Sequence, residues 1–198
     1  MKRYNIINHF IKKNNYTSYL EIGYGSGHNY THIDIPNKIG VDPNPNENAP
    51  ITSTSDDFFS KNIEYFDIIF IDGMHRRKYV ENDINNSLNF LKENGTIVMH
   101  DCNPPTFEYQ TEEHTPSVPG WCGDTWKAFV DFRSREDLFM YTVDTDWGCG
   151  VIKRGKQNPI LIEEEDLNYE NLNSNRKEWL NLITVEEFIS KDIEGVLK

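Results

Sequence analysis

The sequence has little positive charge, and this excludes one class of partner. It holds 20 lysine and arginine residues against 32 acidic ones, which gives a formal net charge of −12 over 198 residues. Proteins that bind a phosphate backbone need clustered basic side chains. The one local basic cluster here is residues 76–78. We therefore expect no nucleic-acid substrate.

Long apolar runs are also absent, and cysteine is scarce. No stretch is long enough to span a bilayer, and the N-terminal residues 1–14 are polar and amphipathic, unlike a signal peptide. Cys102, Cys122 and Cys149 are an odd number without metal-site spacing, which fits reduced thiols better than a disulfide framework. We expect a cytoplasmic protein with no membrane partner.

Strand and helix patterns alternate in the first half of the chain. Apolar runs typical of buried strands occur at 18–22, 38–42, 51–53, 66–72 and 96–101. Helical periodicity occurs at 4–14, 79–90 and 124–135, and a helix start is expected at 55. Gly95 is expected to close the helix that covers 79–90. Such alternation builds parallel βαβ units.

Two further apolar runs, 138–143 and 147–153, predict an antiparallel hairpin that closes the sheet. The predicted fold is α/β, with a Rossmann-like, mostly parallel sheet of seven strands, this hairpin at its C-terminal end and helices on both faces. The domain is expected to cover 1–155. Residues 156–198 are interpreted as an acidic extension, packed on the domain or partly flexible, with a connector at 168–175 and a helix at 176–189.

The first predicted strand runs into a turn with glycines at 23, 25 and 27. Glycine permits positive φ and lets a ligand approach the backbone, so a strand followed by such a turn and a helix start is typical of a nucleotide-like cofactor site. A dinucleotide fingerprint would place its third glycine at 28, where the sequence has His28. An acid on the strand, Glu21, followed by Gly-x-Gly-x-Gly is typical of an S-adenosylmethionine site. The alternative is a glycine-rich loop without a ligand.

Three acids end predicted strands at one edge of the sheet, where ligands of open parallel sheets bind. Asp42 follows the glycines by about twenty residues, where a carboxylate accepts hydrogen bonds from ribose hydroxyls; its alternative role is to open a turn. Asp72 and Asp101 end neighbouring strands about 4.8 Å apart, so they can share a cation such as Mg²⁺. Alternatively, each only caps the segment that follows.

Two histidines lie beside these acids. His75 follows Asp72 by three residues, and a pKa of about 6.5 suits it to act as a general base, although a histidine in a turn is often only solvated. His100 precedes Asp101 on a strand, so we expect it to point to the opposite face as a structural residue. Residues 102–122 are rich in proline and aperiodic, as is common in a lid over a site.

Aromatic side chains flank this loop. Trp121 and Trp147 are candidates to line an acceptor pocket, whereas Trp126 lies on the apolar face of a predicted helix and is expected in the core. Asp144 and Asp146 lie in the turn of the hairpin. They either contact the acceptor or only form the turn.

Four ordered motifs resemble the class I S-adenosylmethionine-dependent methyltransferases. They are Glu21-x-Gly23-x-Gly25-x-Gly27, Gly40-Val41-Asp42-Pro43, the segment 66–75 ending in Asp72-Gly73-Met74-His75, and the segment 91–101 ending in His100-Asp101. The last two are similar to those of the small O-methyltransferases that include the macrolide-sugar enzymes and, more distantly, catechol O-methyltransferase. The resemblance covers residues 15–153.

The resemblance implies an S-adenosylmethionine site. The residues expected to bind this cofactor are Glu21, Gly23, Tyr24, Gly25, Gly27, Asp42, Pro43, Ser55, Asp56, Asp57 and Asp72. The glycines would wrap the methionine part with Glu21 ordering their loop. Asp42 would take the ribose hydroxyls, and Ser55 with Asp56 or Asp57 would flank the adenine.

The resemblance also implies a reaction. Asp72 and Asp101 match the metal-binding acids of metal-dependent members, which bind Mg²⁺ or another divalent cation, and His75 matches the position of the base. Those members often carry Asn after the second acid, where this chain has Cys102, a poor ligand for Mg²⁺; Asn103 is the candidate replacement. The implied activity is O-methylation of a small hydroxylated acceptor such as a sugar or glycan precursor, with Asp72, His75 and Asp101 catalytic.

Two alternatives use the same fold. A nicotinamide-dependent oxidoreductase is disfavoured by the missing glycine at position 28. A cofactor-binding module without turnover is disfavoured because Asp72, His75 and Asp101 occur together. The predicted helix around Trp179 is a candidate surface for pairing two copies of the chain.

Overall fold

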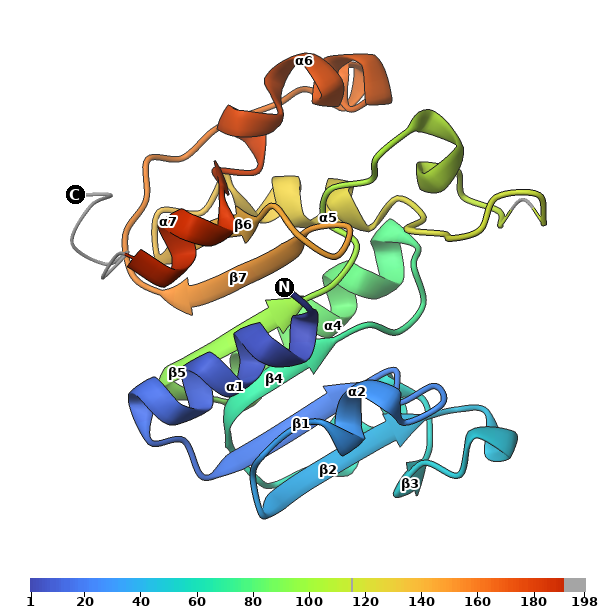
Figure 1. Ribbon diagram of the computed structural model, residues 1–198, viewed down its shortest axis with the longest axis vertical. Helices are drawn as coiled ribbons and strands as arrows, with labels where there is room; N and C mark the ends of the chain where they lie inside the picture. Colours follow the sequence, from blue (N-terminus) through green and yellow to red (C-terminus); the bar gives the residue numbers. More distant parts are fainter. Residues whose placement is uncertain (115, 191–198) are drawn as a thin grey trace.

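The computed structural model describes residues 1–114 and 116–190, which form one mixed sheet between two layers of helices (Figure 1). The strand order is β3-β2-β1-β4-β5-β7-β6-β8. The strands are β1 (Ser18–Ile22), β2 (Asn37–Asp42), β3 (Ile51–Thr52), β4 (Phe66–Ile71), β5 (Leu91–Met99), β6 (Leu138–Val143), β7 (Cys149–Arg154) and β8 (Leu182–Ile183). Strands β1 to β5 pair in parallel, and β7 runs antiparallel to both β5 and β6. The predicted α/β fold with its C-terminal hairpin is confirmed.

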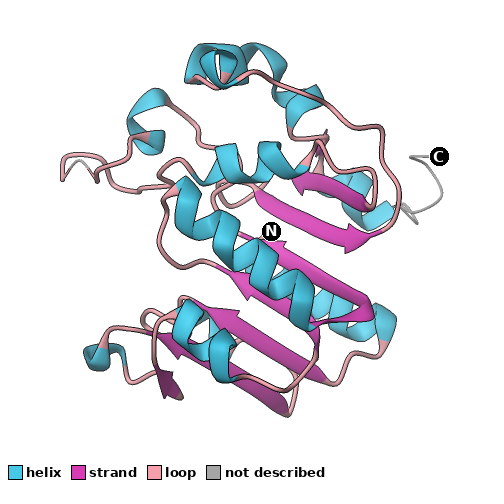
Figure 2. Cartoon of the chain, turned by 180° about the vertical axis from the view of Figure 1, so that it is seen from behind, coloured by secondary structure: helices cyan, strands magenta, loops and turns pink. Residues whose placement is uncertain are grey.

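Helices cover both faces of the sheet (Figure 2). They are α1 (Arg3–Asn14), α2 (His28–Thr31), α3 (Ser55–Lys61), α4 (Arg77–Phe90), α5 (Thr125–Phe132), α6 (Tyr169–Trp179) and α7 (Val185–Ser190). Side chains of a strand alternate between the two faces. Thus Tyr19 and Ile68 join the core cluster under α1, while Leu20 and Ile69 join the cluster under α3, α4 and α5. Both faces of the central strands are buried, which explains their continuous apolar character.

The predicted role of Gly95 as the end of a helix is wrong. Helix α4 ends at Phe90, and β5 begins at the next residue, so Gly95 lies inside a strand. A Cβ on Gly95 would lie 2.7 Å from the side chain of Leu91 and 2.9 Å from the carbonyl oxygen of Asp67. The register of β4 and β5 shifts nearby. Glycine is needed here for a close approach of two strands at an irregularity.

The C-terminal segment differs from the prediction in two ways. Residues 168–175, predicted as a connector, belong to α6, whose N-terminus is capped by the side chain of Asn168 accepting from the N–H of Asn171. The helix predicted over 176–189 is interrupted by β8, which pairs in parallel with β6 and makes an eighth strand instead of seven. Pairing with the edge strand β6 outweighs local helix propensity.

The segment after residue 155 contributes to both core clusters. Leu172, Trp179 and Leu180 pack in the cluster that contains α4 and α5, and Phe188 packs against α1. Residues 191–198 of the predicted extension lie outside the described residues. None of the helices in 1–114 and 116–190 has the length and apolar character needed to span a bilayer.

Candidate active site

A cavity of about 640 Å³ opens at the carboxyl ends of the parallel strands. Nearly all residues predicted to bind a cofactor line it, as do His75 and Asp101; the predicted residues on its wall are Glu21, Gly23, Tyr24, Gly25, Asp42, Pro43, Ser55, Asp56 and Asp72. Gly27 and Asp57 are not among the lining residues. A larger cavity, of about 810 Å³, lies beside Tyr16 and Phe139 and contains none of the predicted site residues.

The glycine turn is held against the ends of the neighbouring strands. The N–H of Gly23 donates to the carbonyl of Val41 at 2.9 Å, and its φ is +85°. A Cβ at this position would lie 2.1 Å from the carbonyl oxygen of Asp72. Gly25, with φ of +49°, has no atom within 4 Å of its own missing Cβ. The turn therefore touches β4 on one side and leaves open space at its tip.

Gly27 and Asp57 lie outside the cavity wall for local reasons. Gly27 precedes α2 with φ of +73°, and the ring of Tyr24 covers it, so that a Cβ would lie 2.5 Å from the hydroxyl of Tyr24. Asp57 lies in the first turn of α3, where its N–H donates to Oγ1 of Thr54. Of the alternatives Asp56 and Asp57, only Asp56 faces the cavity.

Asp42 both forms a turn and faces the cavity. Its Oδ1 accepts from the N–H of Asn44 at 2.8 Å, and its Oδ2 accepts from the N–H of Gly25 at 2.9 Å. Each carboxylate oxygen has a second lone pair. The backbone bonds thus orient the carboxylate without using its full capacity to accept hydrogen bonds from a ligand.

Glu21 is buried behind the glycine turn. It accepts hydrogen bonds from the side-chain amide of Asn29, at 2.9 Å, and from the hydroxyl of Tyr19. Burial raises the pKa of Glu21 to about 7. Its bond to Asn29 ties β1 to α2, the helix that follows the glycine turn. Tyr19 and Asn29 were not recognised from the sequence because neither belongs to the glycine motif.

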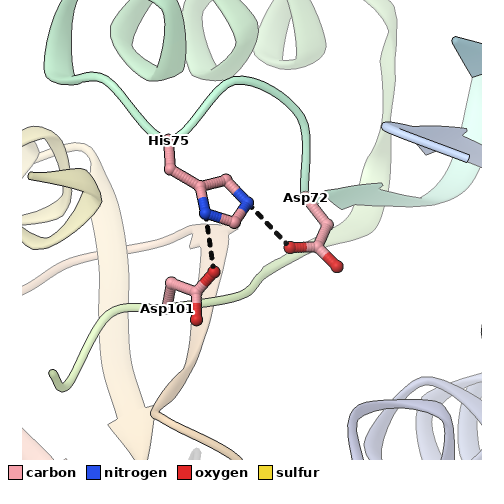
Figure 3. A group of neighbouring side chains, drawn as sticks. All are labelled: Asp72, His75 and Asp101. Carbon is pink, nitrogen blue, oxygen red and sulfur yellow. Dashed lines mark ion pairs between the residues drawn. The ribbon is translucent and has the colours of Figure 1, made fainter. Parts of the chain in front are cut away.

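His75 lies between the carboxylates of Asp72 and Asp101 (Figure 3). Its Nε2 is 3.5 Å from Oδ1 of Asp72, and its Nδ1 is 3.3 Å from Oδ2 of Asp101. Nδ1 is also 2.7 Å from the carbonyl oxygen of Trp121, which can only accept, so Nδ1 carries a proton and Nε2 is the basic nitrogen of the neutral ring. Burial by itself would lower the pKa of His75, but the two carboxylates outweigh it and the net shift is upward.

The prediction that His100 points away from Asp101 is wrong. Strand β5 ends at Met99, and Asp101 has φ of +62°, so the alternation of a strand does not continue to this residue. Nδ1 of His100 lies 3.1 Å from Oδ1 of Asp101 and 3.3 Å from Oδ1 of Asp72. A left-handed conformation is uncommon for a residue other than glycine, although Asp adopts it more readily than most. It places Asp101 beside both histidines.

Arg3 is a further member of this cluster that the sequence did not reveal. Its Nη1 lies 3.3 Å from Oδ2 of Asp72 and 2.6 Å from the ring nitrogens of His100. Burial would raise the pKa of Asp72, but His100, His75 and Arg3 together hold that pKa well below its usual range. Asp72 is therefore an ionised carboxylate, kept so by three cationic or hydrogen-bonding neighbours.

The donor set of this cluster fits a divalent cation. Ligand atoms of Asp72, His75 and Asp101 lie within 4.8 Å of one another. Within the described residues, Oδ1 of Asp101 is buried and makes no hydrogen bond of acceptable geometry, although Nδ1 of His100 lies 3.1 Å away. Carboxylate oxygens are the preferred ligands of hard cations. Cys102 does not join the set, because its thiol is buried and directed at the carbonyls of Met99 and His100.

Asn103, the predicted replacement ligand, is not available to this site. Its amide donates to Oδ1 of Asp144 at 3.0 Å and accepts from the guanidinium of Arg176. It therefore joins the hairpin turn to α6. Asp144 and Asp146 are likewise used within the protein, since Asp146 pairs with Lys2 at 2.7 Å.

Aromatic rings border the cluster on the side of the 102–122 loop. The ring of Trp121 stacks on His75 with centroids 5.2 Å apart, and its Nε1 donates to the carbonyl of Thr111. Trp147, at φ of +61°, is 41% exposed and lies 6.0 Å from the ring of Tyr109. Trp126, by contrast, is buried in the core. The loop and the hairpin turn thus place two tryptophans over the cluster.

Asp83, on α4, gives a prediction about stability because it is buried in the wall of the cavity. Burial, with a contribution from Asp56, raises its pKa from 3.8 to about 7 despite a hydrogen bond from Ser55. Between pH 3.8 and about 7 the Asp83 carboxyl binds more protons in the folded state than in the unfolded state. The contribution of Asp83 to the free energy of unfolding therefore falls as the pH rises through this range, and it is lowest above about pH 7. Asp83→Asn removes this loss. We expect it to stabilise the protein by about 2–4 kcal/mol near pH ~8 and by under about 1 kcal/mol near pH ~4.

Urea unfolding of wild type and Asp83→Asn at both pH values measures this difference. An equal change in unfolding free energy at the two values would contradict the assignment of the buried charge.

Comparison with known proteins agrees with the resemblance seen in the motifs. A family model described as a methyltransferase domain matches residues 43–102, a range that includes Asp72, His75 and Asp101. The structure is similar to the methyltransferase PaMTH1 of Podospora anserina, solved with SAH, with a TM-score of 0.60, 14% identity and 78% of each chain covered. The resemblance to the class I methyltransferases is confirmed.

Two solved structures of O-methyltransferases also have a fold similar to that of this chain. The O-methyltransferase TomG of Streptomyces achromogenes, in complex with SAM, has a TM-score of 0.57 at 11% identity, with 77% of this chain and 79% of TomG covered. The O-methyltransferase of Bacillus cereus, in complex with SAH, has a TM-score of 0.53 at 12% identity, with 76% and 78% covered. A search of the curated proteins found no match. At these identities the structural comparisons establish the fold.

Proposed function

We propose that this chain is an S-adenosylmethionine-dependent O-methyltransferase acting on a small hydroxylated acceptor, such as a sugar or glycan precursor. One observation carries the proposal. The basic nitrogen of His75, held between Asp72 and Asp101, lines the same cavity as the glycine turn and Asp42. A surface suited to the donor and a general base therefore share one cavity.

The donor would bind over the glycine turn. The open space at Gly25 admits the methionine part close to the backbone, and the oriented carboxylate of Asp42 accepts from the ribose hydroxyls. Ser55 and Asp56, on the wall beyond Asp42, border the adenine. The acidic wall suits the positive charge of the sulfonium. These contacts would direct the methyl group toward His75.

Methyl transfer is an in-line displacement that needs an aligned acceptor oxygen and a place for its proton. The acceptor hydroxyl gives its proton to Nε2 of His75 as its oxygen bonds to the methyl carbon, and S-adenosylhomocysteine leaves. Asp101, beside Nδ1, stabilises the imidazolium that forms. A divalent cation held by Asp72 and Asp101 would supply further acidity to the hydroxyl when bound. Trp121 helps exclude water.

The aromatic border favours a carbohydrate as acceptor. Trp147 offers a flat apolar surface on the cavity wall with the ring of Tyr109 beside it, and the ring of Trp121 stacks on His75. Flat rings beside polar groups suit a ligand that has both apolar faces and hydroxyls. A nicotinamide-dependent oxidoreductase is not favoured, because the motif lacks a glycine at position 28 and the comparisons are with methyltransferases. With Cys102, Cys122 and Cys149 free and buried, we propose a cytoplasmic location.

The function is tested by incubating the purified protein with S-adenosylmethionine carrying a deuterated methyl group and a panel of sugars, nucleotide sugars and catechols. Mass spectrometry should find the labelled methyl group on an acceptor oxygen, together with S-adenosylhomocysteine. Transfer to nitrogen or carbon alone would contradict the proposal.

Asp42→Asn is expected to weaken S-adenosylhomocysteine binding by about 10- to 100-fold, because a charged acceptor of ribose hydrogen bonds is lost. Asp57→Asn removes the same charge from a neighbouring position outside the cavity wall and should leave the affinity nearly unchanged. Calorimetric titration of both variants checks this. Equal affinities of the two variants would remove Asp42 from the donor site.

A further inference from the structure

The first residues of the chain are fixed at the edge of the proposed donor site. Nζ of Lys2 and the backbone N–H of Arg3 both contact the carboxylate of Asp146, at 2.7 Å and 3.1 Å. The hydroxyl of Thr145 donates to the carbonyl of Met1 at 2.7 Å. Asp146 belongs to the turn between β6 and β7 and has φ of +50°. The start of α1 is thus tethered to the hairpin turn beside the cavity.

This tether directs the side chain of Arg3 into the cavity. The guanidinium is 25% exposed and reaches Asp72 and His100 through Nη1. A guanidinium has five N–H donors in a planar fork. Within the described residues, Nη2 of Arg3 makes no hydrogen bond. The fork therefore keeps donors that can address a ligand in the same space.

The charge of Arg3 is opposite to that of most charged side chains on the cavity wall. In the described part of the chain, Arg3 is the one lysine or arginine that lines the cavity. The acidic residues on the wall are Glu21, Asp42, Asp56, Asp72, Asp83 and Asp101. A ligand carboxylate among these acids would be repelled and poorly hydrated unless it met a cation. Arg3 is the permanent cation at that wall.

We propose that Arg3 binds the carboxylate of the methionine part of the donor. This inference rests on the proposed function, since it assigns a subsite within that same cavity. The sulfonium and the amino group of the donor are positive and match the acids, while its carboxylate needs the opposite charge. An arginine fork matches a carboxylate in a bidentate pair. Arg3 is therefore a ligand-binding residue, supplied by the N-terminal helix from outside the sequence motifs.

A purely structural role is the competing explanation. In that case Arg3 would serve only as the counter-ion of Asp72 and as part of the tether to Asp146. Such a role would change the affinity for every ligand of the cavity to a similar extent. A role in carboxylate binding changes the affinity only for ligands that carry the carboxylate.

The experiment compares two ligands by calorimetric titration of the 198-residue chain. One is S-adenosylhomocysteine, and the other is its decarboxylated form, which keeps the amino group and lacks only the carboxylate. Arg3→Ala should weaken binding of the first by about 10- to 100-fold and leave binding of the second nearly unchanged. Arg3→Lys, which keeps the charge without the fork, should recover part of the loss.

Lys12→Ala is the matched control, because Lys12 lies on the same helix, is exposed and does not line the cavity; it should bind both ligands as the wild type does. If Arg3→Ala does not fold, Arg3→Gln is titrated with the same two ligands, and the same selective loss of affinity for S-adenosylhomocysteine is expected. Equal effects of the substitution on the two ligands, or none on either, would overturn the inference while leaving the proposed function standing. Failure of the wild type to bind S-adenosylhomocysteine would overturn both.

Discussion

His75→Ala should lower kcat by about 10²- to 10⁴-fold while leaving the affinity for S-adenosylhomocysteine nearly unchanged. The reason is the position of the imidazole. Its basic nitrogen faces the cavity beside Asp72, while the opposite nitrogen is engaged by Trp121 and Asp101. Removing the ring leaves no general base in that place. Steady-state rates with the labelled donor, together with calorimetry, separate the loss of chemistry from a loss of binding.

The matched control is His32→Ala, which removes an exposed histidine that does not line the cavity. Its kcat should equal that of the wild type. Wild-type turnover in His75→Ala would exclude His75 as the base. A parallel loss of donor affinity would instead assign it to binding.

Gly23→Ala is expected to lower the free energy of unfolding by about 3–5 kcal/mol, because two effects add. The residue has φ of +85°, and its new methyl group would lie 2.1 Å from the carbonyl oxygen of Asp72 and 2.6 Å from the N–H nitrogen of Gly73. Since these are backbone atoms, the ends of β1 and β4 must separate to make room. Urea unfolding measures the loss.

Gly25→Ala measures the conformational part of that effect, so the difference between the two variants gives the steric part. Gly25 also has positive φ, but nothing lies within 4 Å of its missing Cβ. Its substitution should cost about 1–2 kcal/mol from conformational strain alone. Equal losses of unfolding free energy in the two variants would contradict the close contact between the glycine turn and the end of β4.

Local sequence signals were sufficient for the parts of the site that lie within one strand and its following turn. Asp42 ends the parallel strand β2, Asp72 directly follows β4, and the glycines at 23 and 25 lie in the turn after β1. Parallel strands bring their carboxyl ends to one edge. Their convergence follows from the fold class. The apolar runs identified the strands because both faces of the central strands are covered.

The rest of the cluster depends on contacts that no local pattern records. Arg3 contacts Asp72, 69 residues away in the sequence, and His100, 97 residues away. These contacts form because α1 begins beside the hairpin turn. The orientation of His100 was predicted wrongly because β5 ends at Met99, one residue before His100, and Asp101 takes a left-handed conformation. Strand β8 was missed because its two residues gain their structure from pairing with β6.

The most direct test of the central claim is calorimetric titration of the wild-type protein with S-adenosylhomocysteine. The proposed donor cavity predicts a single site per chain, with a dissociation constant on the order of 1–100 μM. An absence of heat at millimolar ligand, with NADH binding in its place, would contradict the proposal that the glycine turn, Asp42 and the Asp72–His75–Asp101 cluster form one methyltransferase site.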